Sequence, residues 1–371
     1  MKNDWKSIFN DVKTNAMDNH KEQLMKNLLL LTAQQNASDL HLSVGRYPTI
    51  RVDGKLCPLT QEKVLTAADT KELSDVILGE ANKKELLEKG EIDFSYSLED
   101  KARFRTNVFF QKGCISVAMR LITNKVRALE ELNMPASLYD FASSPQGLFI
   151  ATGPIGHGKS TTLAALIDYI NHNHEKHIIT IEDPIEYVYE QDRSIIDQRE
   201  VGQDSKSFHA ALRAVFREDA NVVLVGEMRD LDTISTAITA AETGHLIFTT
   251  LHTNDSSQTV DRIVDVFPSH QQNQIRYQLA NVLLGVISQR LLPRIGGGRV
   301  PAIEIMIKNH AIGSLIREDK TYQIDNVIET SSREGMISLD KALVNLVQKG
   351  LVSVEDAIIY AKNKEYFSSF S

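Results

Sequence analysis

The sequence predicts an α/β protein whose second half is built on a parallel sheet and is preceded by a smaller α+β domain. Beyond residue 146, short apolar runs rich in β-branched residues show no alternation and are separated by helical segments, as in parallel strands buried on both faces. Between residues 21 and 123, several stretches alternate apolar with polar residues, which indicates an antiparallel sheet. A glycine-rich loop joins the first of the later strands to a helix, so a strand-loop-helix unit opens the second domain.

Composition narrows the class of protein. The chain has 371 residues, of which 42% are hydrophobic and 24% charged, and this suits two or three globular domains. Its net charge of -8 argues against a general affinity for nucleic acid. Cys57 and Cys114 are far apart and form no CxxC motif, so we expect neither a disulfide framework nor a zinc ribbon, and a reducing compartment.

The N-terminal residues lack the continuous apolar core of a signal peptide. The most apolar early run has roughly half of the ~20 residues that are needed to span a bilayer. We therefore expect a cytoplasmic protein with no membrane span of its own, whose contact with a membrane is through a partner.

Changes of periodicity divide the chain into four segments. Residues 1–20 are polar and unpatterned, and we interpret them as a loosely ordered N-terminal extension. Residues 21–123 form the first domain. Residues 124–146 contain two prolines and little periodicity, which is typical of a linker with a short helix. Residues 147–371 form the second domain together with C-terminal helices.

Two local features are predicted within these domains. The Asp53-Gly54 pair between alternating stretches suits a two-residue hairpin turn. After Ser269 helices are expected to predominate, one of them over QIRYQLANVLLGVISQRLL, with one strand over RVPAIEIMI.

The strongest motif is GPIGHGKS at residues 153–160, which matches G-x-x-x-x-G-K-[ST] in full. Gly153, Gly156 and Gly158 allow backbone N–H groups to close around phosphates, and the N-terminus of the following helix adds partial positive charge. Lys159 is expected to reach the β- and γ-phosphates. The motif therefore predicts binding of a nucleoside triphosphate, most simply ATP.

The remaining loop residues have lesser predicted roles. Ser160, or Thr161 beside it, supplies a hydroxyl to Mg²⁺. Pro154, Ile155 and His157 occupy variable positions of the motif, where they line the loop. We expect the His157 side chain to face solvent, with the alternative that it lies over the phosphates and modulates affinity.

Carboxylates follow two of the later apolar strands. Glu227 comes directly after NVVLVG, at the carboxyl edge of a parallel sheet, where it can hold the water shell of Mg²⁺ or orient the attacking water. Glu182, Asp183 and Glu186 follow the strand in HIITIEDPIEY and approach the same edge. Some of these acids are expected to cap helices or to face solvent instead.

Two histidines flank a later strand, in TAAETGHLIFTTLHTND. His245 precedes the strand and His252 follows it, a spacing that does not suit a metal site. For either histidine, a structural role and sensing of the γ-phosphate are both open.

Three arginines of the first domain are candidates for charge stabilisation. Arg103, Arg105 and Arg120 lie on two neighbouring predicted strands, and Arg103 and Arg105 share a face. An arginine that reaches the γ-phosphate from another domain or subunit stabilises the transition state of hydrolysis. The alternative is a solvated face of the sheet.

At these motifs the chain resembles the secretion-motor ATPases, and among them the PilT-like ATPases that retract type IV pili in twitching motility. The resemblance covers the chain from about Lys21 onward. It rests on ASDLHLSVGRYPTIRVDG, RFRTN, GPIGHGKSTT, TIEDPIEY, LVGEMRDLDTI, AETGHLIFTTLHT, LIREDKTYQI and GMISLDKAL. Ile155 and His157 depart from the small polar residues that are more usual in the loop of this family.

The resemblance implies a PAS-like N-terminal domain, a RecA-like C-terminal domain and a ring of six copies with ATP between domains. It implies that Glu227 is the Walker B glutamate and that Glu186 activates water. It also implies that His245 and His252 are the residues of a histidine box, and that arginine fingers lie among Arg103, Arg105 and Arg120. The implied partners are an inner-membrane platform protein of the pilus and, through it, pilin, with the chain peripheral to the membrane.

The function predicted first is therefore a hexameric ATPase motor that powers pilus retraction, as the main or an accessory ATPase. A pilus-assembly or type II secretion ATPase is the alternative within the family, although such relatives usually carry a further N-terminal domain and a four-cysteine zinc motif. A RecA-like nucleic-acid motor is less consistent with the acidic charge. A GTPase is disfavoured because no N-K-x-D follows the loop.

Overall fold

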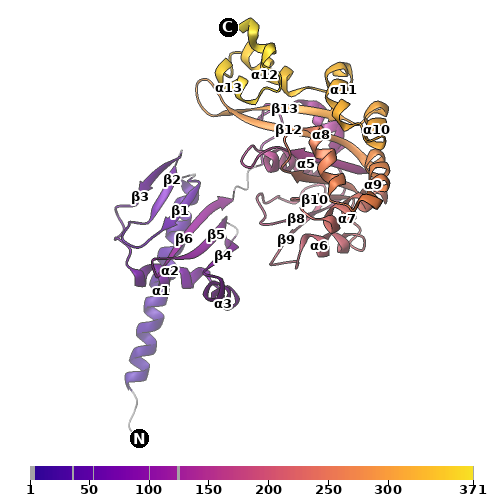
Figure 1. Cartoon of the computed structure of the whole chain (residues 1–371). Coiled ribbons are helices and arrows are strands. Elements are labelled where there is room, and N and C mark those ends of the chain that lie inside the picture. The colour runs from indigo at the N-terminus through magenta and orange to yellow at the C-terminus, as the bar shows by residue number, and fades with distance from the viewer. Residues whose placement is uncertain (1–4, 36, 53, 100, 123–125, 371) are drawn as a thin grey trace. The chain divides into compact units, whose positions relative to one another are not determined.

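The computed structural model describes residues 5–35, 37–52, 54–99, 101–122 and 126–370. The chain divides into two compact units. One comprises the residues up to 124 together with 186–188, and the other comprises 125–185 and 189–371 (Figure 1). Each unit is described by itself.

The first unit is an antiparallel sheet of six strands with helices on one face. The strand order is β3-β2-β1-β6-β5-β4. The strands are β1 (Asp39–Leu42), β2 (Thr49–Val52), β3 (Lys55–Pro58), β4 (Glu91–Leu98), β5 (Ala102–Gln111) and β6 (Cys114–Ile122), and the helices are α1 (Trp5–Gln34), α2 (Ala67–Ile77) and α3 (Glu80–Lys89). The predicted α+β character of this segment is therefore confirmed. Val52 pairs with Lys55 across a two-residue turn, as predicted, although Asp53 lies outside the described residues.

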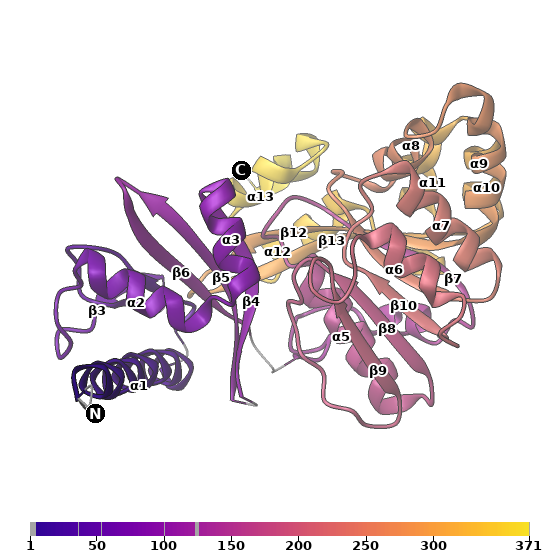
Figure 2. The ribbon, with the colours of Figure 1, turned by 90° about the horizontal axis from the view of Figure 1, so that it is seen from below.

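Helix α1 corrects one expectation. It begins at Trp5, so residues 5–20 are helical and the prediction of a loosely ordered extension is wrong there; residues 1–4 lie outside the described part of the chain. No proline or glycine occurs between residues 5 and 34, so nothing in the sequence interrupts the helix. Its C-terminal half is held by Met25, Leu28 and Leu29, which recur at helical spacing and are buried against the sheet. Helices α1 and α2 lie side by side on this face (Figure 2).

The second unit is a sheet of seven strands in the order β13-β12-β7-β11-β10-β8-β9. All neighbouring strands are parallel except β12 and β13, which form an antiparallel pair. The strands are β7 (Gly147–Thr152), β8 (His177–Glu182), β9 (Ile195–Glu200), β10 (Val222–Val225), β11 (Leu246–Leu251), β12 (Leu283–Pro293) and β13 (Arg299–Ile307). The predicted α/β fold with a parallel core is confirmed.

Helices cover both faces of this sheet. They are α4 (Tyr139–Ala142), α5 (Lys159–Asn173), α6 (Phe208–Val215), α7 (Leu231–Glu242), α8 (Ser256–Asp265), α9 (Ser269–Val282), α10 (His310–Arg317), α11 (Ile324–Thr330), α12 (Leu339–Gln348) and α13 (Val354–Tyr360). Short 3₁₀ helices are η1 (Ala136–Leu138), η2 (Thr321–Gln323), η3 (Ser332–Glu334) and η4 (Lys364–Phe370). The short helix predicted between residues 124 and 146 is thus present. Its Phe141 packs against Phe149 of β7, with the two ring centroids 4.5 Å apart. Among the described helices, none combines the length and the apolar composition needed to cross a membrane.

One predicted helix is wrong in its second half. The run QIRYQLANVLLGVISQRLL is helical only up to Val282, and the remainder is the strand β12. The apolar and β-branched residues of this half, such as Val286 and Ile287, are fully buried between β7 and β13. Pairing with two neighbouring strands therefore outweighs the local preference, which a continuous apolar run does not define.

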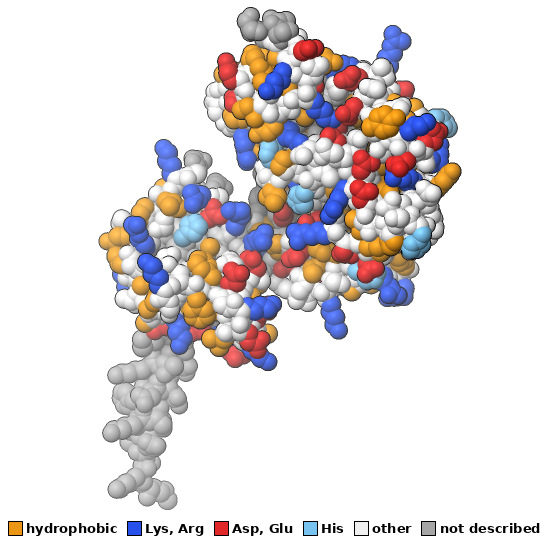
Figure 3. Space-filling model, in the orientation of Figure 1, with side chains coloured by type: hydrophobic (Ala, Val, Ile, Leu, Met, Phe, Trp, Pro, Cys, Tyr) orange, Lys and Arg blue, Asp and Glu red, His pale blue; other side chains and the backbone are white. Residues whose placement is uncertain are grey.

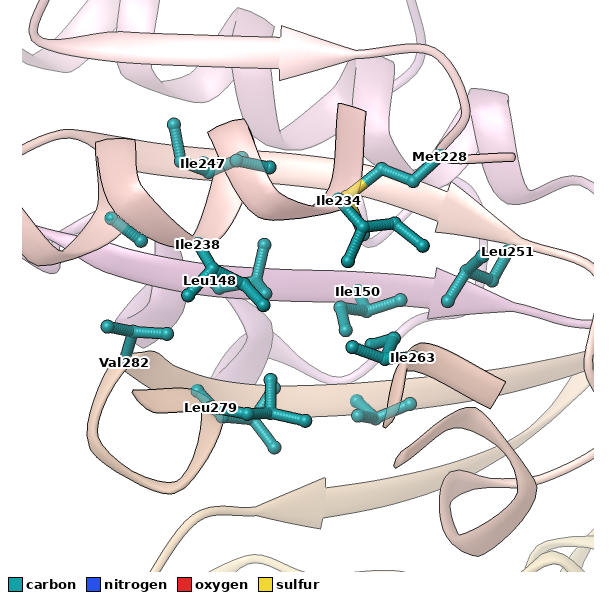
Figure 4. Close-up of a cluster of buried hydrophobic side chains, with 14 of the residues drawn as sticks. Leu148, Ile150, Met228, Ile234, Ile238, Ile247, Leu251, Ile263, Leu279 and Val282 are labelled. Atoms are coloured by element: carbon teal, nitrogen blue, oxygen red, sulfur yellow. The ribbon is translucent and has the colours of Figure 1, made fainter. Parts of the chain in front are cut away.

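The largest core of the unit lies between the sheet and helices α7, α8 and α9 (Figure 4). Leu148 and Ile150 of β7 and Ile247 of β11 pack there against Ile234 and Leu279 of the helices. Every residue of β7 is buried, because α5 covers the opposite face of the strand. The end of β7, and with it the start of the glycine-rich loop, is therefore held by packing on both faces.

We predict that Gly285→Ala destabilises the second unit by about 1 to 3 kcal/mol, as overpacked cores do. A Cβ atom at Gly285 of β12 would lie 2.7 Å from the carbonyl oxygen of Met306 and 2.7 Å from Cε1 of Phe141. The midpoint of urea unfolding measures this change. The matched variant is Gly313→Ala in α10, where the new Cβ finds ordinary contacts and a helix interior favours alanine by about 0.5 to 1 kcal/mol. Equal midpoints for both variants would contradict the packing described for β12.

Candidate nucleotide-binding site

The loop between β7 and α5 has the backbone geometry that the motif requires. Gly153 has φ +135° and Gly158 has φ +84°, conformations that residues with a side chain rarely adopt. A Cβ atom at Gly153 would also lie 2.4 Å from the carbonyl oxygen of Gln289. Glycine at this position is therefore required twice, by its dihedral angle and by the close approach of β12.

Gln289 of β12 contacts both the loop and the first turn of α5. Its Oε1 accepts a hydrogen bond of 2.8 Å from the hydroxyl of Thr162, in the first turn of α5. Its Nε2 lies 2.8 Å from the position that a Cβ atom would take at Gly158. Gln289 is buried, and sequence reasoning missed it. A signal was present, since a glutamine and an arginine interrupt an otherwise apolar run, and buried polar groups need specific partners.

Lys159 lies inside the loop. Its side chain is buried, and Nζ donates hydrogen bonds to the carbonyl oxygens of Gly153 at 2.8 Å and Pro154 at 2.9 Å. Nδ1 of His252 lies 3.4 Å from the same Nζ. The ammonium group is thus held by the loop that encloses the predicted phosphate position, which suits a lysine that binds β- and γ-phosphates.

Glu227 and His252 meet next to this lysine. Glu227 follows β10 and His252 follows β11, which are neighbouring parallel strands, so both lie at the carboxyl edge of the sheet. Nε2 of His252 lies 3.5 Å from Oε2 of Glu227, and Nε of Arg229 lies 2.6 Å from Oε1. In the neutral tautomer that carries hydrogen on Nε2, Nδ1 of His252 is an acceptor that faces Nζ of Lys159, and Nε2 is a donor that faces the carboxylate of Glu227. The carboxylate of Glu227 thus lies beside His252, which in turn lies beside Lys159 of the loop.

The second predicted carboxylate segment is only partly in this unit. Glu182 ends β8, next to β10, and is buried. Glu186 is exposed and belongs to segment 186–188, which groups with the first unit. The geometry of the second unit therefore does not include Glu186, and its role in activating water stays a prediction.

The two histidines of the predicted pair are far apart. His245 precedes β11 and His252 follows it, so the six residues of the strand separate them by about 20 Å. Nδ1 of His245 lies 3.0 Å from the carbonyl oxygen of Ala240, and its ring forms a T-shaped pair with that of Phe216. The structure therefore brings His252, but not His245, to Lys159 and Glu227 of the same chain.

The arginines of the first unit lie on the face of the sheet opposite its core. Arg105 and Arg120 are directly opposite each other on β5 and β6. Nε of Arg120 lies 3.0 Å from Asp39, and Nη2 of Arg105 lies 3.9 Å from Asp93. Arg103, two residues before Arg105, shares this face and is half-buried. Their assignment as arginine fingers stays a prediction.

His157 does not face solvent, and that expectation is wrong. It is half-buried, and its Nδ1 accepts a hydrogen bond of 2.9 Å from the backbone N–H of Leu291. Burial, together with the nearby charges of Arg290, Lys159 and Arg299, lowers the pKa of His157. The neutral imidazole is therefore favoured, as its acceptor role requires. Ile155, by contrast, is 84% exposed.

Mg²⁺ fits this site only together with a nucleotide. Among the described residues, no group of three or more histidine, cysteine or acidic side chains is arranged to hold a metal ion. Ser160, at the start of α5, and Glu227, at the end of β10, offer single oxygen donors. Mg²⁺ commonly takes one or two protein ligands and completes its shell with substrate phosphates and water, so this donor set suits a Mg²⁺–nucleotide complex.

A cavity of about 170 Å³ lies elsewhere in the second unit. It is lined by the end of α5 and the starts of β10 and β11, including His174, Asn221 and Leu246. These residues lie at the amino edge of the sheet, whereas the loop follows the carboxyl end of β7. The cavity is therefore not the phosphate site.

We predict that Gly153→Ala weakens binding of a fluorescent ATP analogue by at least about 100-fold, because the loop cannot keep its path against Gln289. Gly156→Ala is the matched variant, since its φ is also positive but a new Cβ there meets no atom within 4 Å. Its loss is expected to be smaller, about tenfold, from backbone strain alone. Equal losses in titrations of the two variants would contradict the described contact with β12.

We predict that His252→Ala lowers kcat for ATP hydrolysis by about 10-fold or more and that His245→Ala has a smaller effect. Only His252 lies beside Lys159 and Glu227 of the same chain. Steady-state hydrolysis assays compare the two variants. A larger loss for His245→Ala would show that the relevant histidine comes from elsewhere in an assembly.

Comparison with known proteins agrees with this geometry. A family model described as type II/IV secretion system protein matches residues 14–297. The type IV pilus retraction ATPase PilT of Pseudomonas aeruginosa is 48% identical over 345 residues, which is 92% of this chain and 98% of that protein. The type IV pilus ATPase PilU of the same organism is 36% identical over 335 residues, 90% of this chain and 87% of that protein.

The crystal structure of the pilus retraction motor PilT with bound ADP has a TM-score of 0.84 and 46% sequence identity, and the match covers 90% of this chain and 95% of that one. Both the sequence and the fold are thus shared over nearly the whole length. The chain belongs to the family of type II/IV secretion system proteins, in which ATPases of the PilT type are its near relatives.

Proposed function

We propose that this chain is the ATPase motor that powers retraction of a type IV pilus. The observation that carries the proposal is the full-length relationship to PilT, at 48% identity, combined with Lys159, Glu227 and His252 at one edge of the sheet. The PilT crystal structure contains ADP, which supports an adenine nucleotide as the ligand, and it is described as a pilus retraction motor, which supports the pilus as the machine. The residues of the site suit hydrolysis of that nucleotide. The greater identity to PilT than to PilU favours the main retraction ATPase over an accessory one.

In the proposed mechanism, Lys159 exchanges its hydrogen bonds with the carbonyl oxygens of Gly153 and Pro154 for the β- and γ-phosphates of ATP. The hydroxyl of Ser160, with Thr161 beside it, and the carboxylate of Glu227 would hold Mg²⁺, which would supply neutralisation of phosphate charge.

The remaining residues act on the attacking water. We propose that Glu227 orients this water and that Glu186 takes its proton while the bond to the leaving ADP breaks. His252, which lies between Glu227 and Lys159, is proposed to sense the γ-phosphate. Arg103, Arg105 and Arg120 are the proposed fingers. His245 is not given a role at the site of its own chain.

We further propose a homohexamer that acts at the cytoplasmic side of an inner-membrane platform protein, and through it on pilin. Support comes from the relatives, which are named for the pilus machine. A role on nucleic acid is not proposed: the net charge is -8, and acidic and basic side chains are mixed on the face shown in Figure 3.

We predict that the purified chain hydrolyses ATP as six-subunit particles and that Glu227→Gln reduces kcat by about 100-fold or more while ATP binding persists. The control is Glu175→Gln, which removes an exposed carboxylate whose partner is Arg193. Hydrolysis assays and native mass measurements test both variants. A stable monomer with undiminished turnover in Glu227→Gln would refute the assigned site and the assembly together.

The direction of the motor is tested in the native host. Loss of a retraction ATPase leaves cells with surface pili that do not shorten, whereas loss of an assembly ATPase leaves cells without pili. We expect the first phenotype from deletion, restored by the wild-type chain and not by Glu227→Gln. Absence of pili after deletion would instead assign the chain to assembly.

A further inference from the structure

His157 links the phosphate-binding loop to the C-terminal segment of the chain. Its Nδ1 accepts the hydrogen bond from the backbone N–H of Leu291 of β12, and its ring is in a T-shaped arrangement with that of Tyr360, with ring centroids 6.1 Å apart. Tyr360 is the last residue of α13, about two hundred positions later in the sequence. A side chain at a variable position of the loop thus contacts an element to which the motif assigns no role.

The segment that carries Tyr360 is anchored two residues further on. Nζ of Lys362 lies 3.1 Å from Glu304 of β13, 3.0 Å from Asp325 of α11 and 3.5 Å from Asp255. Burial lowers the pKa of Lys362, but the charges of these three carboxylates outweigh it and raise the pKa above the ordinary value of a lysine. Lys362 therefore stays charged and joins three separate elements.

The backbone of the segment is anchored as well. The N–H groups of Lys362 and Asn363 donate to the two carboxylate oxygens of Asp340, at 2.8 and 3.0 Å. Asp340 is buried at the start of α12. A charged side chain and two backbone hydrogen bonds thus determine where Tyr360 lies.

The anchor and the nucleotide site share a loop. Asp255, which contacts Lys362, follows His252 by three residues. Asn254, between them, accepts a hydrogen bond of 2.7 Å through its carbonyl oxygen from Nη2 of Arg290, the residue between Gln289 and Leu291. Both routes from the C-terminal segment, through His157 and through Asp255, end at the loop that holds Lys159.

We infer that the C-terminal segment Tyr360–Lys362 positions the phosphate-binding loop for ATP, with His157 as the positioning residue that connects them. The inference rests on the proposed ATPase function and adds to it a coupling between nucleotide binding and the docking of this segment. By linkage, nucleotide binding stabilises the docked segment to the same extent that docking tightens nucleotide binding.

The test compares variants by their KM for ATP and their kcat. His157→Ala removes the acceptor for Leu291 N–H and the ring that faces Tyr360, and we expect KM to rise about fivefold with kcat within about twofold. His157→Asn places an oxygen where Nδ1 lies, so it is expected to restore most of the affinity.

Lys362→Met is also expected to raise KM, although it changes no residue of the loop. Lys349→Met, an exposed lysine after α12 with no ion pair among the described residues, is the matched control and leaves KM unchanged.

The double variant His157→Ala/Lys362→Met separates a shared pathway from two independent effects. If both residues act through one connection, its KM is no higher than that of the more affected single variant. A merely structural contribution of either residue lowers the thermal midpoint without changing KM selectively, and it is not rescued by asparagine.

Hydrogen exchange provides a measurement that does not depend on turnover. We expect an ATP analogue to slow exchange in residues 354–363 of the wild type and not of His157→Ala, and Lys362→Met to speed exchange in the loop even without nucleotide. A KM within twofold of wild type in His157→Ala, with unchanged exchange in residues 354–363, overturns the inference and leaves the ATPase proposal intact. Failure of the wild type to bind or hydrolyse ATP overturns the proposed function, and exchange in the nucleotide-free variants then still decides whether loop and segment are coupled.

Discussion

The site depends on the burial of β7 in the middle of the seven-stranded sheet. This strand has a helix layer on each face and a parallel neighbour on each side, β12 and β11, so its end is held both by packing and by strand pairing. The loop that begins at Gly153 inherits that position, and so does the N-terminus of α5. Parallel strands end at a common edge of the sheet. His252 follows the neighbouring strand β11 and Glu227 follows β10, so both lie at the edge where the loop begins. Packing and pairing of the strands therefore bring these polar groups to one edge of the sheet, and the hydrogen bond between Gln289 and Thr162 adds to the support of the loop.

Electrostatics explains why the loop favours a polyanion. Lys159 and Arg290 are both buried, and the positive charge of each acts on His157, where it lowers the pKa and favours the neutral imidazole. Carbonyl oxygens accept hydrogen bonds from Lys159 and from Arg290, and the charges of Glu304 and Asp255 also act on Arg290. The carboxylate of Glu227, beside His252, is paired with Arg229. In a partly desolvated site, the attraction between such cations and phosphate oxygens is stronger than it is in water.

The sequence predicted the parts of the site that are local and missed those that are set by tertiary contacts. The loop, its glycines and Lys159 follow from a contiguous motif, and Glu227 follows from the rule that parallel strands end at one edge. The difference between His245 and His252 is also readable in principle, because six extended residues must separate their ends. Gln289 was not predicted, because its partners Gly153 and Thr162 lie more than a hundred residues earlier and the run around it was interpreted as helix. His157 was misplaced for the same reason, since Leu291 and Tyr360 approach it only in the folded chain.

The two close contacts of Gln289 differ in kind, and this has a consequence for how the loop can evolve. At Gly158 the obstructing atom belongs to the glutamine side chain, so a smaller residue at position 289 makes room, and the dihedral angle alone remains as a restriction. At Gly153 the obstructing atom is a backbone carbonyl oxygen, which every residue at position 289 carries. No compensating substitution at that position can relieve it. The first glycine of the loop is therefore fixed by the path of a neighbouring strand, and only a shift of the strand itself can release it.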